Sequence, residues 1–190
     1  AVKPGDIILV HAAAGGMGLI LCQWAKALGA TIVGTVSTRE KAEVAKEAGC
    51  HFPVVRSEKS FVEVVREVTN NEGCAVVYEA IGKDTLQDSL DTLRPMGTCA
   101  AYGHVSGPPD PVDIIQDLGR RGSLFITRPA IMHYVAKRAD LEWTARDLFK
   151  AIGDKIISAN INYEYELKDA VQAHTAIESG KTLGASVLVP

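Results

Sequence analysis

The sequence predicts an α/β protein with a three-layer αβα architecture, in which helices cover both faces of a doubly wound, six-stranded parallel sheet. Apolar runs of strand length alternate with helical patterns through residue 130, as such folds require. A turn of small residues joins the first strand directly to its helix. The chain has 190 residues, of which 47% are hydrophobic, so one domain can bury a large core.

The first two elements flank this turn. The aliphatic run 7–10 predicts a buried strand, and an apolar helical pattern follows the turn at 12–18 and extends to Leu28. Ser37 and Glu40 have the spacing of a capping box at the start of a second helix. Further strands are expected at 31–36, 52–55, 74–78, 98–102 and 123–127. Helices are expected at 37–48, 60–69, 84–93 and, as a short turn, 114–118.

Residues 1–130 therefore predict two mononucleotide-binding halves, the arrangement known as the Rossmann fold. Residues 131–190 are more than that fold requires. They predict a helix at about 140–152, an extended piece near 161–165, a helix at 167–179 and a final strand at 185–189.

Charge and cysteine content narrow the class of protein. The formal net charge of −3 gives no indication of a nucleic-acid or membrane partner, and no apolar run approaches the roughly 18 residues of a membrane span. The four cysteines lie far apart in apolar runs, which excludes a C-x-x-C metal knuckle and predicts reduced core thiols of a cytoplasmic protein. The first residue is Ala1 rather than methionine, so we expect a segment of a longer protein.

The turn at 12–18 has the residue types of a dinucleotide-binding motif. Gly15 allows the backbone to approach a pyrophosphate, Gly18 allows close packing of helix and strand, and the helix N-terminus offers free N–H groups. Position 13 is alanine, so the first glycine of G-x-G-x-x-G is absent. The alternative is an ordinary strand–helix turn whose small residues serve packing alone.

The end of the second predicted strand favours NADP over NAD. NAD-selective proteins place Asp or Glu about 20 residues after the glycines, but Thr35 stands there in this chain. Ser37 and Thr38 can donate hydrogen bonds, and Arg39 and Lys41 add positive charge for a 2′-phosphate. The alternative is that Ser37 only caps the helix and Lys41 is only a solvated side chain.

Local patterns assign no catalytic residue and no metal site. No tyrosine has a lysine four positions later, no G-x-S-x-G motif occurs, and the five histidines lack metal-ligand spacing. His51 and His174 are expected at the surface. His104 follows the fifth predicted strand, where doubly wound sheets bind ligands, so a position beside a cofactor and a plain surface position are both open.

A combination of short motifs gives the chain a family resemblance. The glycine turn has the form Ala12-x-x-Gly15-x-x-Gly18, and further shared stretches lie at 2–6, 23–26, 77–82, 123–129 and 188–190. In this combination the chain resembles the zinc-independent quinone oxidoreductases, the ζ-crystallin-like branch of the medium-chain dehydrogenase/reductase superfamily. The resemblance covers essentially the whole chain.

The resemblance implies cofactor-binding positions for NADPH along the carboxyl edge of the sheet. Gly16 and Met17, with Gly15, match positions whose backbone meets the pyrophosphate, and Ile81 matches a position beside the cofactor. Family members often have Phe-Gly-Asn along the nicotinamide half, so His104 replaces asparagine with a titratable ring. The family segment that runs along the nicotinamide half matches Tyr102, Gly103, His104 and Val105. The family segment nearest the carboxamide matches Pro129, Ala130 and Ile131.

The adenosine 2′-phosphate is expected at the loop that contains Ser37, Thr38 and Lys41, in agreement with the charge argument. Arg56 occupies a position where family members often carry tyrosine, and its contact with the phosphate is expected to depend on charge. Near the C-terminus the family often has arginine where this chain has glycine, so the adjacent Lys181 is the candidate for that contact.

The resemblance also implies an activity, namely NADPH-dependent reduction of a quinone-like electrophile, a small-molecule substrate. Two alternatives stay open. One is a reductase of enones or related activated alkenes, and the other is a non-catalytic NADPH-binding protein in the manner of ζ-crystallin. Hydride transfer and one-electron transfer are not distinguished.

Family members carry a GroES-like domain before the cofactor-binding domain. We expect the final strand after Gly184 to return toward such a domain, and residues 1–190 alone to lack useful turnover because half of the cleft lies outside them. Family members commonly dimerise by pairing their sixth strands. The apolar run 123–127 at the sheet edge therefore predicts a homodimer, unless a helix or loop covers this edge.

Overall fold

The computed structural model of the chain describes residues 2–159 and 161–190. Its main sheet has six strands in the order β3-β2-β1-β4-β5-β6, and each neighbouring pair is parallel. The strands are Ile7–Val10 (β1), Thr31–Val36 (β2), Phe52–Val55 (β3), Cys74–Glu79 (β4), Leu93–Ala101 (β5) and Phe125–Thr127 (β6). The strand order reverses between β1 and β4, so the predicted doubly wound sheet is confirmed.

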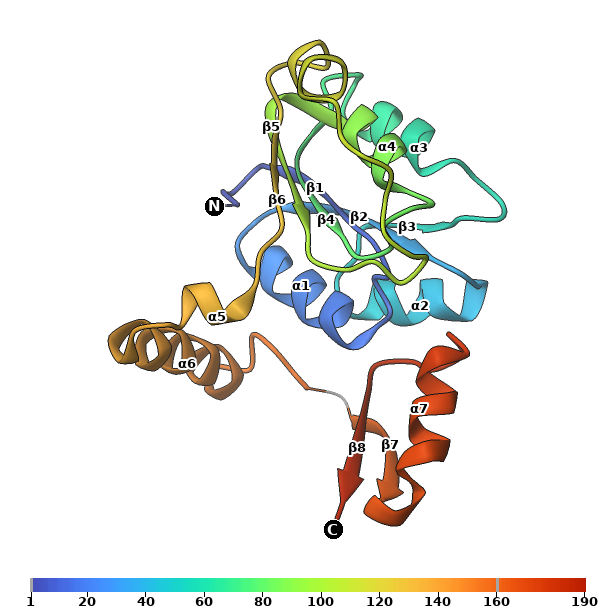
Figure 1. Cartoon of the computed structure of the whole chain (residues 1–190), viewed down its shortest axis with the longest axis vertical. Coiled ribbons are helices and arrows are strands. Elements are labelled where there is room, and N and C mark those ends of the chain that lie inside the picture. The colour runs from blue at the N-terminus through green and yellow to red at the C-terminus, as the bar shows by residue number, and fades with distance from the viewer. Residues whose placement is uncertain (1, 160) are drawn as a thin grey trace.

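Helices cover both faces of this sheet (Figure 1). The helices in question are Gly16–Ala27 (α1), Arg39–Glu47 (α2), Phe61–Val68 (α3) and Leu86–Asp91 (α4). Ile8 and Ile32 belong to the core on the α1–α2 side, whereas Leu9 and Val33 belong to the core on the α3–α4 side. Because alternate residues of each strand are buried on opposite faces, these strands read in the sequence as continuous apolar runs.

The start of α2 differs from the prediction. Thr38, not Ser37, caps this helix, because the Thr38 hydroxyl accepts a hydrogen bond from the Lys41 N–H at 3.2 Å. The capping box predicted for Ser37 and Glu40 is therefore wrong. The shift leaves Ser37 at the end of β2, where its side chain is not used by the helix.

The last two strands of the sheet also differ in length from the prediction. β5 begins at Leu93 instead of residue 98, and Met96 interrupts it with a φ of 60° while its N–H donates to Gly122 O at 2.8 Å. β6 begins two residues late, because Ser123 has a φ of 57° and cannot continue an extended strand. A π-helical turn, Ile114–Gly119 (η1), precedes β6, and a short helix that was not predicted, Ile131–Tyr134 (α5), follows it.

The last elements of the chain form a small unit beyond the carboxyl edge of the main sheet, whereas helix Arg138–Gly153 (α6) lies apart from it, beside α5 (Figure 1). The elements of this unit are Ile161–Glu166 (β7), Leu167–Asp169 (η2), Ala170–Glu178 (α7) and Ala185–Val189 (β8). β7 and β8 pair in parallel as a separate two-stranded sheet. The chain returns to the glycine turn just before β8, where Gly184 N–H donates to Ala14 O at 3.1 Å. This contact brings the tail to the edge where ligands bind in doubly wound folds.

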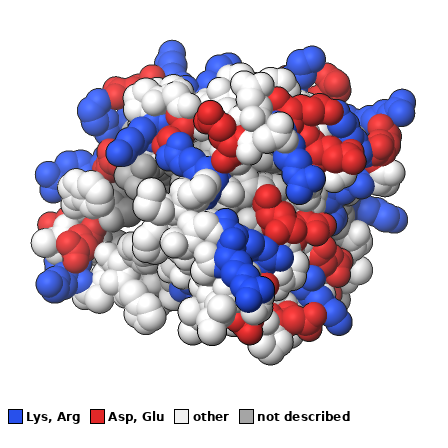
Figure 2. Space-filling model, turned by 90° about the horizontal axis from the view of Figure 1, so that it is seen from above, with Lys and Arg blue, Asp and Glu red and all other residues white. Residues whose placement is uncertain are grey.

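The surface and the cysteines agree with the composition. Basic and acidic side chains are interspersed over the face seen in Figure 2, without a broad region of one sign. All four cysteines are buried and free, as predicted. Among the residues that the structure describes, no helix has the length and apolar character needed to cross a bilayer.

Candidate functional site

A cleft of about 430 Å³ opens at the carboxyl ends of β1, β2 and β4, on the side where the strand order reverses. This is the place where doubly wound sheets bind ligands. Six of the residues predicted for the cofactor site line it together, although they come from five separate stretches of the chain: Gly15, Ser37, Lys41, Arg56, Ile81 and Val105.

Several predicted residues lie next to the cleft without lining it. Gly16 and Met17 form the start of α1 directly after Gly15, and Thr38 caps α2. Lys181 is exposed between Gly180 and Thr182, which do line the cleft. The remaining neighbours, which lead from β5 to Val105, are Tyr102, Gly103 and His104.

The predicted carboxamide segment lies elsewhere. Pro129 and Ala130 line a second hollow of about 250 Å³ after β6, together with Arg128 and His133. Ile131 begins α5 and is 68% exposed. The structure of the described residues therefore does not bring this segment into the cleft that contains Gly15 and Lys41.

Sequence reasoning missed part of the lining. Asp84 and Ser106 close the β4 side, where Ser106 Oγ accepts from the Asp84 N–H at 3.1 Å and donates to Ile81 O at 2.9 Å. Gly180 and Thr182 come from the tail, far away in the sequence. Four further lining residues were not predicted, although they lie at or just after the carboxyl ends of β1 and β2, where doubly wound sheets bind ligands. They are Ala12, Ala14, Thr35 and Val36.

Positive charge gathers at the β2–β3 end of the cleft. Lys41 Nζ donates to Gly180 O at 2.6 Å, which ties α2 to the tail and holds the ammonium at the rim. Arg56 follows β3 and lines the same cleft. Among the described residues, neither Lys41 nor Arg56 forms an ion pair with a carboxylate. Their charge is therefore available to an anionic ligand.

The glycine turn places the start of α1 tightly against β1. A Cβ on Gly18 would lie 2.2 Å from Ala12 O and 2.7 Å from Ala13 Cα, so this helix approaches the turn at a distance that only glycine permits. The first turn of α1 contains no acidic residue, and its N-cap, Gly15, has no side chain to accept from the N–H groups. The N-terminus of a 12-residue helix thus faces the cleft with positive polarity.

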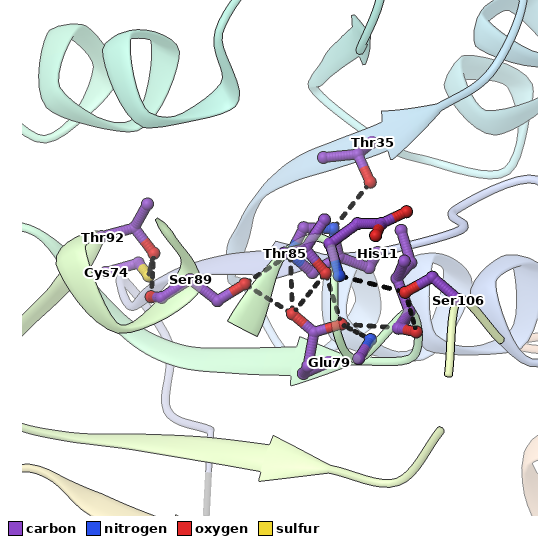
Figure 3. Close-up of polar contacts among 11 residues, drawn as sticks. His11, Thr35, Cys74, Glu79, Thr85, Ser89, Thr92 and Ser106 are labelled. Carbon is purple, nitrogen blue, oxygen red and sulfur yellow. Dashed lines mark hydrogen bonds and ion pairs between the residues drawn. The ribbon is translucent and has the colours of Figure 1, made fainter. Parts of the chain in front are cut away.

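A buried polar network around His11 and Glu79 lies beneath the cleft (Figure 3). It connects two residues that line the cleft, Thr35 and Ile81. His11 lies at the end of β1, with Nδ1 2.9 Å from Thr35 Oγ1 and Nε2 2.9 Å from Ser89 Oγ. Ser89 Oγ donates to Glu79 Oε2 at 2.6 Å. Glu79 Oε1 accepts from the Ile81 N–H at 2.7 Å, so the carboxylate fixes the turn that carries Ile81 into the cleft.

The protons in this network follow from the donor inventory. Ser89 gives its one proton to Glu79, so its oxygen accepts from His11 Nε2–H, and His11 Nδ1 then accepts from the Thr35 hydroxyl. Burial lowers the pKa of His11 to about 4, against the attraction of Glu79 and with added repulsion from Arg56. Burial acts to raise the pKa of Glu79, but His11, Ser89 and two backbone N–H groups together hold it below its usual value. The pair is therefore neutral histidine and ionised glutamate at neutral pH.

The neutral state of His11 predicts acid-sensitive stability. The unfolded chain takes up a proton on this ring below its ordinary pKa of 6.5, whereas the folded chain resists until about 4, so stability is lost as the pH falls through this window. We expect a loss of about 3 kcal/mol from this group, measured by urea unfolding at a series of pH values. His11→Gln should flatten the dependence between these two pKa values. An unchanged slope in that variant contradicts the assignment.

The sheet order, the glycine turn and the cleft at the reversal of strand order define the class of doubly wound, nucleotide-binding α/β domains. Residues 16–134 match the zinc-binding dehydrogenase family. The chain therefore belongs to this family. Despite that description, no group of three or more His, Cys, Asp or Glu side chains suited to a metal ion occurs among residues 2–159 and 161–190.

Curated relatives narrow the comparison. A 2-haloacrylate reductase of Burkholderia is 52% identical over all of this chain, which covers 57% of the relative. Quinone oxidoreductase 1 of Escherichia coli (strain K12) is 41% identical over all of this chain, which covers 58% of it. The resemblance to quinone oxidoreductases is confirmed, and the chain spans little more than half the length of these relatives.

Solved structures agree. The Escherichia coli quinone oxidoreductase complexed with NADPH superposes with a TM-score of 0.94 at 41% identity, over 100% of this chain and 58% of its own. The described fold is therefore that of the corresponding part of these proteins.

Proposed function

We propose that the cleft binds NADPH, with the adenosine 2′-phosphate between Lys41 and Arg56. The observation that carries this proposal is the positive charge of Lys41, in the first turn of α2, and of Arg56, directly after β3, since both side chains line the cleft. An NAD-selective cleft would place a carboxylate at the end of β2, where Val36 and Ser37 lie instead. A phosphate dianion gains strong charge-assisted hydrogen bonds from ammonium and guanidinium groups.

The start of α1 fits a pyrophosphate. Its first turn is uncapped by any side chain and carries no acidic group that would repel an anion. We therefore assign the pyrophosphate to the backbone of Gly15, Gly16 and Met17. Ser37 and Thr38 are proposed beside the 2′-phosphate, and Lys181 is proposed to approach it from the tail, supported by the neighbouring lining residue Gly180.

The nicotinamide half is proposed to extend past Ile81 and Val105, which line the cleft on its β4–β5 side. The residues proposed along this half are Tyr102, Gly103 and His104, followed by Pro129, Ala130 and Ile131 after β6. Successive strands β4, β5 and β6 are neighbours in the sheet, so their carboxyl ends form one continuous row. That order supports the assignment.

We further propose that the full-length protein reduces a quinone-like electrophile. NADPH, when bound, supplies a hydride, and with one proton from water the quinone becomes a hydroquinone and NADP⁺ is released. The role of the residues in this chain is to bind and orient the cofactor. The quinone oxidoreductases among the relatives support this reaction. The 2-haloacrylate reductase, at 52% identity, favours a second candidate, the reduction of an activated alkene.

Turnover of the full-length protein with a quinone panel and an enone panel, monitored by NADPH oxidation, tests these candidates. We expect reduction of at least one panel, and a rate with NADH that is lower by roughly tenfold or more at equal subsaturating concentration. If NADPH binds and neither panel is reduced, the enzymatic proposal is overturned in favour of a non-catalytic NADPH-binding protein. Residues 1–190 alone are expected to show no useful turnover.

Lys41→Ala should weaken NADPH binding roughly 10- to 100-fold, because it removes a charge-assisted hydrogen bond to the 2′-phosphate. The affinity for NADH, which lacks that phosphate, should change less than about twofold. Lys46→Ala removes an exposed lysine from the other end of the same helix and serves as the control. Titration followed by nicotinamide fluorescence measures the affinities of the wild type and both variants for NADPH and NADH. Equal losses for NADPH and NADH contradict the role of Lys41.

The wider organisation is also a proposal. Residues 1–130 form the cofactor-binding core, and residues 131–190 complete it and return toward a GroES-like domain, which the separate β7–β8 sheet supports. A homodimer through β6 is supported by the edge position of this strand and by the 60% exposure of Phe125. Light scattering of the full-length protein checks it, and a monomer overturns it. The buried free cysteines support a reducing compartment such as the cytoplasm.

A further inference from the structure

Arg128 lies at the carboxyl end of the sheet, directly after β6, and is held by two neutral acceptors. Its Nη1 donates to Ala101 O at 3.0 Å, at the end of β5, and its Nη2 lies 3.4 Å from His104 Nδ1. A guanidinium can only donate, so the His104 Nδ1 accepts in this geometry. The side chain is thereby oriented by groups that leave its positive charge uncompensated.

The absence of a carboxylate distinguishes Arg128 from the other oriented arginines. Arg94 pairs with Asp6 and Arg121 pairs with Asp91, whereas within residues 2–159 and 161–190 no carboxylate forms an ion pair with Arg128. The side chain is exposed. Since a guanidinium has five N–H donors, several of them remain available to a ligand.

The guanidinium borders the hollow of about 250 Å³ after β6. That hollow also offers two hydroxyl groups and a second imidazole as possible donors, from Thr127, Tyr134 and His133. A site with a fixed cation, several neutral donors and no acidic side chain in its lining suits a small planar anion. A carboxylate matches the fork of a guanidinium in both size and geometry.

We propose that Arg128 binds the carboxylate of an anionic substrate, an α,β-unsaturated acid, in the hollow after β6, beside the residues proposed for the nicotinamide half of the cofactor. This inference rests on the proposed function and specifies its substrate class. In the reaction, hydride from NADPH adds to the β-carbon, the π electron pair takes a proton from water at the α-carbon, and NADP⁺ and the saturated acid leave. Electron density moves toward the carboxylate as the hydride adds, so a guanidinium on that group favours the addition.

The test compares an acid with an uncharged analogue of the same size, using the full-length protein. 2-Chloroacrylate and 2-chloroacrylamide are assayed with the wild type, Arg128→Gln, Arg128→Lys and the control Arg120→Gln. Arg120 is an exposed arginine at the end of η1, before β6 and thus on the opposite edge of the sheet. Binding of the unreactive 2-chloropropionate to the NADP⁺ complex is measured by calorimetry in parallel.

For Arg128→Gln we expect a 10- to 100-fold increase in KM for the acid and a matching loss of 2-chloropropionate affinity. The KM values for the amide and for NADPH should stay within about threefold. Arg128→Lys should be intermediate, because it keeps the charge and loses the fork, and Arg120→Gln should match the wild type.

Equal effects of Arg128→Gln on acid and amide overturn the inference and indicate that Arg128 only joins β5 to β6. Reduction of quinones by a wild type that does not accept the acid also overturns it, while the proposed function stands. A wild type that neither binds NADPH nor oxidises it with any acceptor overturns the proposed function itself.

Discussion

Glu79→Ala is expected to lower the free energy of unfolding by about 3–5 kcal/mol. The carboxylate is fully buried and accepts from four donors, so its removal leaves several polar groups without partners. Two of these donors are the N–H groups of Ile81 and Gly82, at 2.7 and 3.1 Å. The turn that holds Ile81 in the cleft should loosen with the core, and NADPH affinity should fall together with stability.

Urea unfolding at pH 7.5 measures this effect, with Glu67→Ala as the matched control. Glu67 is an exposed glutamate paired with Lys59 at 2.8 Å, and such pairs contribute less than about 1 kcal/mol. Glu79→Gln keeps the shape and one acceptor oxygen, so it should fall between the two. If Glu79→Ala costs no more than Glu67→Ala, the buried network does not stabilise the fold.

Gly18→Ala should destabilise the protein by about 3 kcal/mol or more, because the new methyl group meets backbone instead of a movable side chain. The added Cβ would lie 2.2 Å from Ala12 O and 2.7 Å from both Ala13 C and Ala13 Cα. Helix α1 must therefore move away from the turn, and its N-terminus moves out of the cleft. Loss of NADPH binding is expected even where the fold survives.

Gly16→Ala separates this steric effect from the general effect of replacing a helical glycine. Its Cβ would lie 3.4 Å from Gly184 O, an ordinary contact, and alanine favours a helix over glycine by about 1 kcal/mol. Thermal or urea unfolding should show wild-type stability or better for Gly16→Ala. Similar stability of the two variants would contradict the close packing at Gly18.

Much of the fold is predictable because buried parallel strands consist of uninterrupted runs of apolar residues. The bounds 31–36 and 52–55 agree with β2 and β3, and 185–189 agrees with β8. The predicted bounds of β5 and the predicted cap of α2 were wrong, because local backbone geometry determines both. Neither the positive φ of Met96 nor the choice of Thr38 over Ser37 as the cap has a periodic signal.

The sequence predicts those residues of the candidate site that lie in the glycine turn or that match positions of the related family. Gly15, Lys41 and Arg56 were expected at the cofactor and line one cleft. The link between His11 and Glu79 was not predictable, because the two residues end different strands that become neighbours only in the sheet. Gly180 and Thr182 at the rim were not predictable either, because they lie far in the sequence from the other lining residues.

The proposed binding of NADPH depends on two cations that line the cleft, Lys41 in α2 and Arg56 directly after β3. The most direct measurement is the titration of the wild-type protein with NADPH and with NADH under identical conditions, followed by fluorescence. We predict a preference for NADPH of roughly tenfold or more, which shrinks as salt screens Lys41 and Arg56. Equal affinities for the two cofactors, or a preference for NADH, would show that Lys41 and Arg56 do not bind the 2′-phosphate.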